Sequence, residues 1–277
     1  MMKDLSSLLE DFFHSQLKEW RLARDNFAAL DKCEFRYMRL GQFSLTLVHN
    51  PARMISCAAK VDDKSIRERQ CFLCPVNRPA EQKSLKLPEL EGFEVLVNPY
   101  PVCRCHFVIS STEHIPQGRI PVVMKKAAEI FGGYAVFYNG AKAGASAPDH
   151  LHLQLVPKSE VPSISLLDKC NGTDLTDMPF GIIPRSGEKA WECVSNYSDV
   201  ENVNVFMWKD RQDILHSVII PRRAHRPSCY YRDDGFLVSP GALDMGGLVI
   251  LPRQGDLDRI TSGDLWKVFS ETGFAVR

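Results

Sequence analysis

The amino-acid sequence predicts an α+β fold made of two related halves, for two reasons. Short runs of β-branched and aromatic residues recur along the chain and are separated by few helical patterns. The chain also repeats itself weakly, since HFVISSTEH (106–114) is similar to HSVIIPRRAH (216–225) and PDHLHLQLVP (148–157) aligns with LDMGGLVILP (243–252). Duplication of an α+β unit accounts for both similarities, although short β segments can also be similar by chance.

The second copy of this repeat lacks two histidines of the first. Met245 and Gly247 stand where the first copy has His150 and His152. We therefore expect the second half to be degenerate, and the first half to carry the chemistry.

The elements expected in the first half follow from residue spacing. Large apolar residues between Leu5 and Trp20 recur at helical spacing and predict an amphipathic helix from residue 4 to about 24. Two β-rich runs joined at Gly41 predict a hairpin. Residues 50–92 are rich in Pro, Lys, Arg and Glu and show little periodicity, so we expect a long irregular loop there. The other expected elements are strands at 35–40, 43–49, 93–97, 107–110, 135–138 and 151–156, and a helix at 121–134.

A linker is expected before the second half. Pro, Ser, Gly and Asp are frequent from residue 158 to 190, and β-rich runs follow at 203–208, 217–220 and 247–251. The predicted organisation is a catalytic half over residues 1–157, a linker over 158–190 and a degenerate half over 191–277.

Composition narrows the class of protein. The 277 residues are 44% hydrophobic and 25% charged, an ordinary globular mixture. Lys plus Arg and Asp plus Glu both equal 34, so the chain is neutral and we expect no nucleic-acid partner. No run reaches the roughly 18–20 apolar residues of a transmembrane helix, and the first residues do not read as a signal peptide. Nine scattered cysteines favour reduced thiols, so we expect a cytoplasmic protein with no membrane partner.

Two histidines and a glutamine alternate along one predicted strand. On a strand, His150, His152 and Gln154 point to one face, while the leucines between them point to the core. Such a strand is a rigid platform that would present two imidazoles and an amide outward. The alternative is a half-exposed strand with polar residues facing water.

A loop of small residues leads into this strand. NGAKAGASAPDH (139–150) would let backbone N–H groups around Gly144 approach a phosphate closely. Asn139 and Ser146 could donate side-chain hydrogen bonds to the same anion. The alternative is a loop that is small for reasons of packing.

Arginines could add a local patch for an anionic ligand within this neutral chain. The candidates are Arg67, Arg69, Arg222 and Arg223. Solvated surface residues or local ion pairs are the alternative.

The pair Cys71 and Cys74 forms a CxxC motif, which indicates either a redox pair or half of a zinc site. Redox pairs usually begin a helix after a strand, whereas this pair lies in a Pro-rich segment. Zinc needs about four nitrogen or sulfur ligands, and His114 and His150 are the candidates for the other two. His106 could also be a ligand, but a structural role for this histidine is equally expected.

Together these motifs resemble the transferase branch of the histidine-triad superfamily, which includes galactose-1-phosphate uridylyltransferase and diadenosine tetraphosphate phosphorylase (ATP adenylyltransferase). CFLCPVN (71–77) is similar to the zinc loop of the uridylyltransferase, and NPYP (98–101) to a segment of both enzymes. HFVISSTEH has the strand-and-turn spacing of the superfamily. HLHLQ (150–154) is closer to the phosphorylase than to the uridylyltransferase.

The resemblance implies a role for each matching residue. His152 matches the nucleophile that accepts the nucleotidyl group, and Gln154 stands where hydrolytic members have a third histidine. Asn139 and Ser146 match phosphate-contacting positions in the loop that contains Gly144. Cys71, Cys74, His114 and His150 match the ligands of a structural zinc ion. The implied fold is two histidine-triad-like halves, each an antiparallel sheet with flanking helices.

The implied function is a nucleotidyltransferase or nucleotide phosphorylase. It would transfer a nucleoside monophosphate through a nucleotidyl-histidine intermediate to phosphate or a sugar phosphate, with an adenylyl donor favoured. A hexose-1-phosphate uridylyltransferase or a phosphorylase of nucleotide sugars is the alternative, and a zinc-stabilised protein that only binds nucleotides is another. A homodimer is expected from the resemblance alone.

Overall fold

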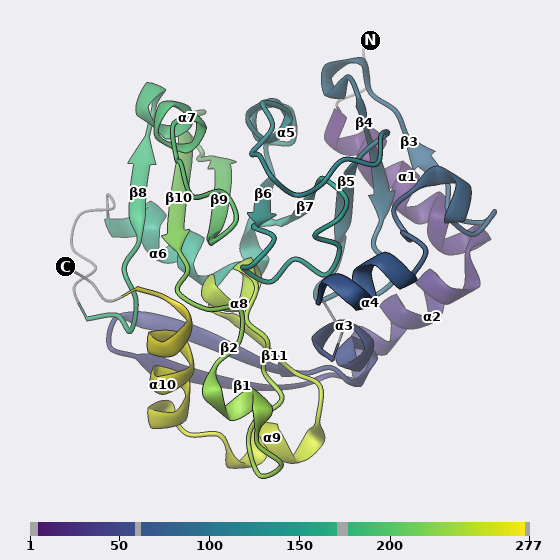
Figure 1. Cartoon of the computed structure of the whole chain (residues 1–277). Helices are drawn as coiled ribbons and strands as arrows, with labels where there is room; N and C mark the ends of the chain where they lie inside the picture. The colour runs from purple at the N-terminus through teal and green to yellow at the C-terminus, as the bar shows by residue number, and fades with distance from the viewer. Residues whose placement is uncertain (1–4, 59–61, 171–176, 275–277) are drawn as a thin grey trace.

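The computed structural model describes residues 5–58, 62–170 and 177–274 (Figure 1). The helices are α1 (Leu5–Glu19), α2 (Arg21–Ala29), α3 (Met54–Cys57), α4 (Asp63–Glu68), α5 (Val123–Ile130), α6 (Pro162–Cys170), α7 (Glu188–Ser195), α8 (Ala242–Met245), α9 (Gln254–Arg259) and α10 (Ser262–Thr272). The strands are β1 (Glu34–Leu40), β2 (Phe43–His49), β3 (Ser84–Leu85), β4 (Phe93–Val97), β5 (Phe107–Ser111), β6 (Tyr134–Asn139), β7 (His152–Pro157), β8 (Ile183–Ser186), β9 (Val203–Lys209), β10 (Leu215–Pro221) and β11 (Leu248–Leu251). None of the helices in the described ranges has the length and apolar character needed to cross a bilayer.

One large antiparallel sheet spans both halves of the chain. Its eight strands are in the order β3-β4-β5-β7-β6-β9-β10-β8. The two halves meet where β6 pairs with β9, with Ala135 opposite Trp208 and Asn139 opposite Asn204. The α+β prediction is therefore confirmed, and the antiparallel strands of the two halves form a single sheet.

Alternating side chains give the large sheet two different apolar faces. In β9, Val205 and Met207 pack with the cluster that contains α1, α2, α5 and α7. Phe206 and Trp208 pack on the opposite side, with a second sheet of order β1-β2-β11 and helices α6, α8, α9 and α10. In Figure 1, α5 and α7 lie at the top and the small sheet lies at the bottom with α9 and α10.

The prediction of one long N-terminal helix over residues 4–24 is wrong in one respect. Trp20 is extended (φ −111°, ψ 100°) and separates α1 from α2. The break lets α2 fold back, so that the rings of Phe13 and Phe27 meet edge to face at 4.8 Å. Phe13 also packs against Phe107 of β5, so both helices bury their apolar sides against the large sheet.

Several expected boundaries also change. The hairpin at Gly41 is confirmed, and Gly41 has the positive φ of 58° that such a turn needs. Residues 50–92 are less irregular than expected, because they contain α3, α4 and β3. The helix expected at 121–134 shortens to α5. The segment from 158 to 190 contains α6 and β8, and β8 pairs with β10 at the edge of the large sheet.

The two parts of the internal repeat differ in their placement. Strands β5 and β10 both lie in the large sheet, as the similarity of their sequences suggests. Strand β7 lies near the centre of that sheet, whereas β11 pairs in parallel with β2 in the small sheet. The alignment of residues 148–157 with 243–252 therefore does not correspond to equivalent positions in the fold.

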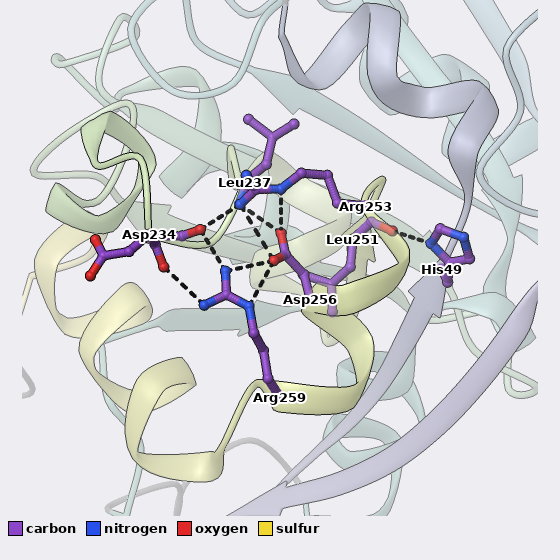
Figure 2. Close-up of polar contacts among 8 residues, drawn as sticks. His49, Asp234, Leu237, Leu251, Arg253, Asp256 and Arg259 are labelled. Atoms are coloured by element: carbon purple, nitrogen blue, oxygen red, sulfur yellow. Dashed lines mark hydrogen bonds and ion pairs between the residues drawn. The ribbon is translucent and has the colours of Figure 1, made fainter.

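A buried carboxylate fixes the loop before α8. Asp256 is 2% exposed and accepts hydrogen bonds from Arg253, Arg259 and the backbone N–H of Leu237 (Figure 2). Arg259 also donates to the carbonyl oxygen of Asp234 at 2.9 Å. These charge-assisted bonds anchor the chain just before residues 239–244, which contribute to the site described below.

Candidate active site and metal centre

Four side chains from separate parts of the first half converge on one point. Cys71 and Cys74 come from the loop before β3, His114 from the turn after β5, and His150 from the loop before β7. Their ligand atoms all lie within 4.8 Å of one another. This cluster brings together all four predicted metal ligands and could hold a metal ion.

The geometry of the cluster fits a tetrahedral ion. The Nδ1 atom of His150 lies 3.3 Å from Sγ of Cys71 and 3.6 Å from Sγ of Cys74, and Nδ1 of His114 lies 3.2 Å from Sγ of Cys74. Bonds of about 2.3 Å to sulfur and 2.0 Å to nitrogen would separate such ligands by about 3.5 Å. His150 Nε2 lies 2.9 Å from the carbonyl oxygen of Ser111, to which it donates, so Nδ1 keeps its lone pair toward the sulfurs.

A cavity of about 660 Å³ adjoins this cluster and is lined by both halves of the chain. The first half contributes all the predicted catalytic and phosphate-binding residues, namely His152, Gln154, Asn139, Gly144 and Ser146. The second half contributes residues 225–226, 239, 241–244 and 250. The second half is therefore part of the cavity wall.

The histidine platform is covered rather than exposed. His150 is 0% and His152 is 5% exposed, so the expectation that they face outward from the strand is wrong. On this side of the sheet the CxxC loop packs with Leu96 of β4 and Val108 of β5. Residues of the second half line the same cavity as His152. Leu151 and Leu153 are fully buried among the helices on the opposite face, as the alternation predicted.

His152 is held in one tautomer. Its Nδ1 lies 2.8 Å from the carbonyl oxygen of His150 and donates a hydrogen bond to it. Nε2 is then the unprotonated nitrogen, and it makes no hydrogen bond within the described residues. Burial lowers the pKa of His152 to about 4, against the hydrogen bond to the His150 carbonyl oxygen, which raises it, so the ring is neutral near pH 7. A neutral imidazole with a free Nε2 lone pair is a nucleophile.

His106 orients the amide of Gln154. Nδ1 of His106 accepts a hydrogen bond from the Val102 backbone N–H at 3.2 Å, so its proton is on Nε2. Nε2 donates to Oε1 of Gln154 at 2.9 Å, which leaves the Gln154 amide nitrogen as a donor for the cavity. Burial and then the nearby Arg53 lower the pKa of His106 to about 3, which keeps the ring neutral.

Asn139 is oriented in the same way by the second half. Its Oδ1 accepts hydrogen bonds from Nδ2 of Asn204 at 2.8 Å and from the backbone N–H of Ala242 at 2.7 Å. The amide nitrogen of Asn139 is therefore the group left to donate. Asn204 is held in turn by Arg222, which donates to its Oδ1. Two side-chain amides, from β6 and β7, thus offer N–H donors beside His152.

The small-residue loop is shaped by packing as well. Gly144 has φ +93°, and a Cβ there would lie 2.5 Å from Cα of Gly241. Ala143, Ala145 and Ala147 are all 0–1% exposed. The packing interpretation of this loop is therefore correct for these residues, and it is compatible with Ser146 and Gly144 lining the cavity.

Charged groups give the cavity a positive wall. Arg53, Arg69 and Arg226 line it together with one carboxylate, Asp244. Arg69 is paired with Asp149, the residue before His150. Arg222 is 1% exposed and makes its hydrogen bonds to neutral oxygen atoms inside the protein, so its expected place in a patch that binds an anionic ligand is wrong.

Sequence reasoning missed Gln117 and Asn204, which support the site, and gave Arg222 a different role from the supporting one it has. All three lie far in sequence from the residues they support, and no short motif contains both partners. A polar residue predicted in the middle of an apolar strand, such as Asn204 in VNVFMW, is the signal that could have identified one of them.

Comparisons with known proteins give the fold. The chain superposes on yeast Ap4A phosphorylase Apa2 with a TM-score of 0.60 and 15% identity, covering 92% of this chain and 97% of that chain. The complex of Apa2 with AMP gives 0.56 and 16% identity, over 94% and 97% of the two chains. The complex with Ap4A gives 0.63 and 16% identity, over 92% and 97%. The chain therefore has the same fold as this phosphorylase.

Two sequence comparisons were also informative about the family of the chain. The model of a family described as "Domain of unknown function (DUF4922)" matches residues 12–157. No curated protein matches the chain. The matched segment contains the CxxC loop and the strand that begins at His152.

Proposed function

Because the chain belongs to the DUF4922 family, whose description states no activity, we propose a function from the site itself. The protein is a nucleotidyltransferase that transfers a nucleoside monophosphate from a polyphosphate donor to a phosphate acceptor through a covalent bond to His152. The observation that carries this proposal is the hydrogen bond from His152 Nδ1 to the His150 carbonyl oxygen, which leaves Nε2 free beside the cavity.

The reaction proceeds in two steps, each of which forms one bond to phosphorus and breaks another. In the first, the Nε2 lone pair of His152 bonds to the α-phosphorus, and the bond from that phosphorus to its bridging oxygen breaks. The leaving polyphosphate keeps that electron pair, while the His150 carbonyl oxygen stabilises the charged ring. In the second, an acceptor oxygen bonds to the same phosphorus and the P–N electron pair returns to Nε2. Two transfers of this kind predict ping-pong kinetics.

Amide donors stabilise the charge on the phosphoryl oxygens. The amide nitrogens of Asn139 and Gln154 are left as donors beside His152 by the hydrogen bonds to their oxygen atoms. The backbone near Gly144 and the hydroxyl of Ser146 line the same cavity. Oriented donors of this kind lower the barrier most when they need no rearrangement during the reaction.

We assign zinc to the cluster of Cys71, Cys74, His114 and His150. Two sulfur and two nitrogen ligands suit zinc, and four protein ligands leave no open position, so its role is structural. The ion would hold His150, whose carbonyl oxygen sets the tautomer of His152. In this way the metal centre supports the nucleophile without touching the substrate.

An adenylyl donor is the substrate we propose. The fold neighbours were solved with AMP and with Ap4A, and HLHLQ resembles the phosphorylase form of the motif. Arg53, Arg69 and Arg226 give the cavity cationic groups for a polyphosphate. Trp20, Phe72 and Tyr100 also line it and offer aromatic surface for a base.

Intact-protein mass spectrometry tests this function. The metal-loaded protein is incubated with diadenosine tetraphosphate, ATP, and ADP-, UDP- and GDP-sugars. We expect a mass increment of one adenylyl group with the adenosine donors, lost in His152→Ala. His216→Ala is the matched control, because His216 lies in β10, where it bonds to Asp210, and should keep the label. Labelling by UDP- or GDP-sugars alone would replace the adenylyl assignment, and no labelling by any donor would contradict covalent catalysis.

A further inference from the structure

Strands β6 and β7 part at the edge of the cavity. Their ladder runs from Tyr134 opposite Pro157 to Phe137 opposite Gln154. The same register would place Tyr138 opposite Leu153 and then Asn139 opposite His152. The ladder stops before these two pairs, although β6 still pairs with β9 at Asn139 and β7 still pairs with β5 at His152. Both strands therefore continue, but apart from each other.

The side chain of Gln117 fills this gap. Its Nε2 donates to the carbonyl oxygens of Asn139 and His152, both at 2.9 Å. Its Oε1 accepts from the backbone N–H of His152 at 2.9 Å. Gln117 is 1% exposed, and its own backbone N–H donates to the carbonyl oxygen of Pro148 at 2.9 Å. One buried amide thus replaces the direct bonds between two strands at the residues that face the cavity.

We propose that Gln117 is a positioning residue that sets the separation between His152, the nucleophile, and Asn139, a donor to the transferred phosphoryl group. This inference rests on the proposed function. In a regular antiparallel ladder, opposed residues lie about 4.5–5.5 Å apart at Cα. An inserted amide widens that spacing while fixing both peptide groups, so the two side chains can hold one phosphoryl group between them. It also fixes the backbone of His152 at both its N–H and its carbonyl oxygen.

The chain contains a matched control for this role. Gln16 in α1 is also 1% exposed and also bridges two backbone groups, donating to the Glu81 carbonyl oxygen at 3.2 Å and accepting from the Lys83 N–H at 2.9 Å. Gln16 is not among the residues that contact the cavity or its catalytic strand. The loss of folding stability should therefore be similar at the two glutamines, whereas a loss of catalytic rate should occur only at Gln117.

The test compares Gln117→Met and Gln117→Glu with Gln16→Met and Gln16→Glu. Methionine keeps the length of the side chain without its hydrogen bonds, and glutamate keeps the acceptor for the His152 N–H but loses both donors. We expect the rate of nucleotidyl-His152 formation to fall by about 100-fold in both Gln117 variants, since small misplacements of reacting groups have effects of this size. The Kd for AMP should change less than about threefold, because binding contacts remain. Both Gln16 variants should keep the wild-type rate.

The outcomes separate this inference from the proposed function. A wild-type protein that no donor labels would contradict the function, and this inference with it. If a donor labels the wild-type protein and the Gln117 variants are labelled at the same rate, the positioning role alone would be overturned. Equal losses in the Gln16 variants, or failure of both Gln117 variants to fold, would reduce Gln117 to a structural residue and overturn the inference as well.

Discussion

The side-chain nitrogen of Asn204 donates a hydrogen bond to the side-chain oxygen of Asn139 at 2.8 Å, across the β6–β9 junction of the two halves. Asn204 is fully buried and is itself held by Arg222. A residue of the second half therefore decides which end of the Asn139 amide faces the cavity. The second half is part of the site, although the chemistry was predicted for the first half.

Replacing Asn204 should slow transfer as well as destabilise the fold. In Asn204→Ala, the Asn139 amide can rotate and Arg222 loses an acceptor. We expect the labelling rate to fall about 10- to 100-fold, the scale of losing one oriented donor. The free energy of unfolding should fall by about 1–3 kcal/mol, the cost of unsatisfied buried groups. Labelling kinetics and urea unfolding measure the two effects. Asn202→Ala, whose side chain bonds Asp199, is the control; an unchanged rate in Asn204→Ala would contradict the role.

Loss of a metal ligand should loosen both the fold and the nucleophile. Cys71→Ser should purify with less zinc by elemental analysis. It should also melt at least about 5 °C lower, because a structural zinc site contributes directly to folding. Cys193→Ser, a partly buried cysteine of α7 outside the cluster, should change neither quantity. Full zinc content in Cys71→Ser would show that Cys71 is not a ligand.

His106 and Gln154 should behave as one unit. His106→Leu removes the donor that orients the Gln154 amide. Its effect on the labelling rate should therefore depend on the presence of Gln154. If each single variant slows labelling about tenfold, the double variant His106→Leu, Gln154→Ala should be little slower than Gln154→Ala alone. Independent effects that multiply in the double variant would show that His106 does not act through Gln154.

His106 should also make the protein sensitive to acid. Its folded pKa of about 3 lies below the ordinary value of 6.5, so between these values the unfolded chain binds a proton that the folded protein excludes. Stability should therefore fall as the pH drops from about 6.5 toward 3, by up to about 1.4 kcal/mol per pH unit from this residue. In urea unfolding across this range, His106→Leu should show a shallower decline than the wild type. Parallel declines would mean that His106 does not contribute.

Gly144 should tolerate alanine poorly for two separable reasons. Gly144→Ala meets both the strain of a φ of +93° and the close approach of the Gly241 backbone. Gly92→Ala is the matched variant, because Gly92 has a φ of +76° and nothing within 4 Å of an added Cβ. We expect about 1 kcal/mol of destabilisation at Gly92 and clearly more at Gly144 in urea unfolding. Equal values would show that the loop moves away from the second half at little cost.

The parts of the site that short motifs encode could be predicted from the sequence. The CxxC motif, His114 and His150 do converge, and His152, Gln154 and the small-residue loop do line one cavity. These groups are specified by local spacing on strands and loops. The alternation in β7 correctly assigned its leucines to the core, since period-2 patterning depends on the strand alone.

The rest depends on contacts that no local pattern records. The break at Trp20 arises because α1 and α2 fold against each other and the sheet, whereas their apolar spacing is also that of a single helix. The burial of His152 arises in the tertiary fold, which local alternation cannot predict. Gln117 looks like an ordinary polar residue and Arg222 like a candidate for binding an anion. Only the tertiary fold brings their hydrogen-bonding groups to the strands that they support.

The parallel pairing of β2 with β11 has a consequence for biosynthesis. Thr46 of β2 lies opposite Leu248 of β11, so the small sheet joins two strands that are about 200 residues apart in the sequence. On the ribosome, this edge of β2 must remain unpaired until residues 248–251 have been made. Contacts of such long sequence separation fold slowly and leave a strand edge open to association. We therefore expect nascent chains that end before β11 to need chaperones, and the folding chain to gain much of its cooperativity when β11 pairs with β2.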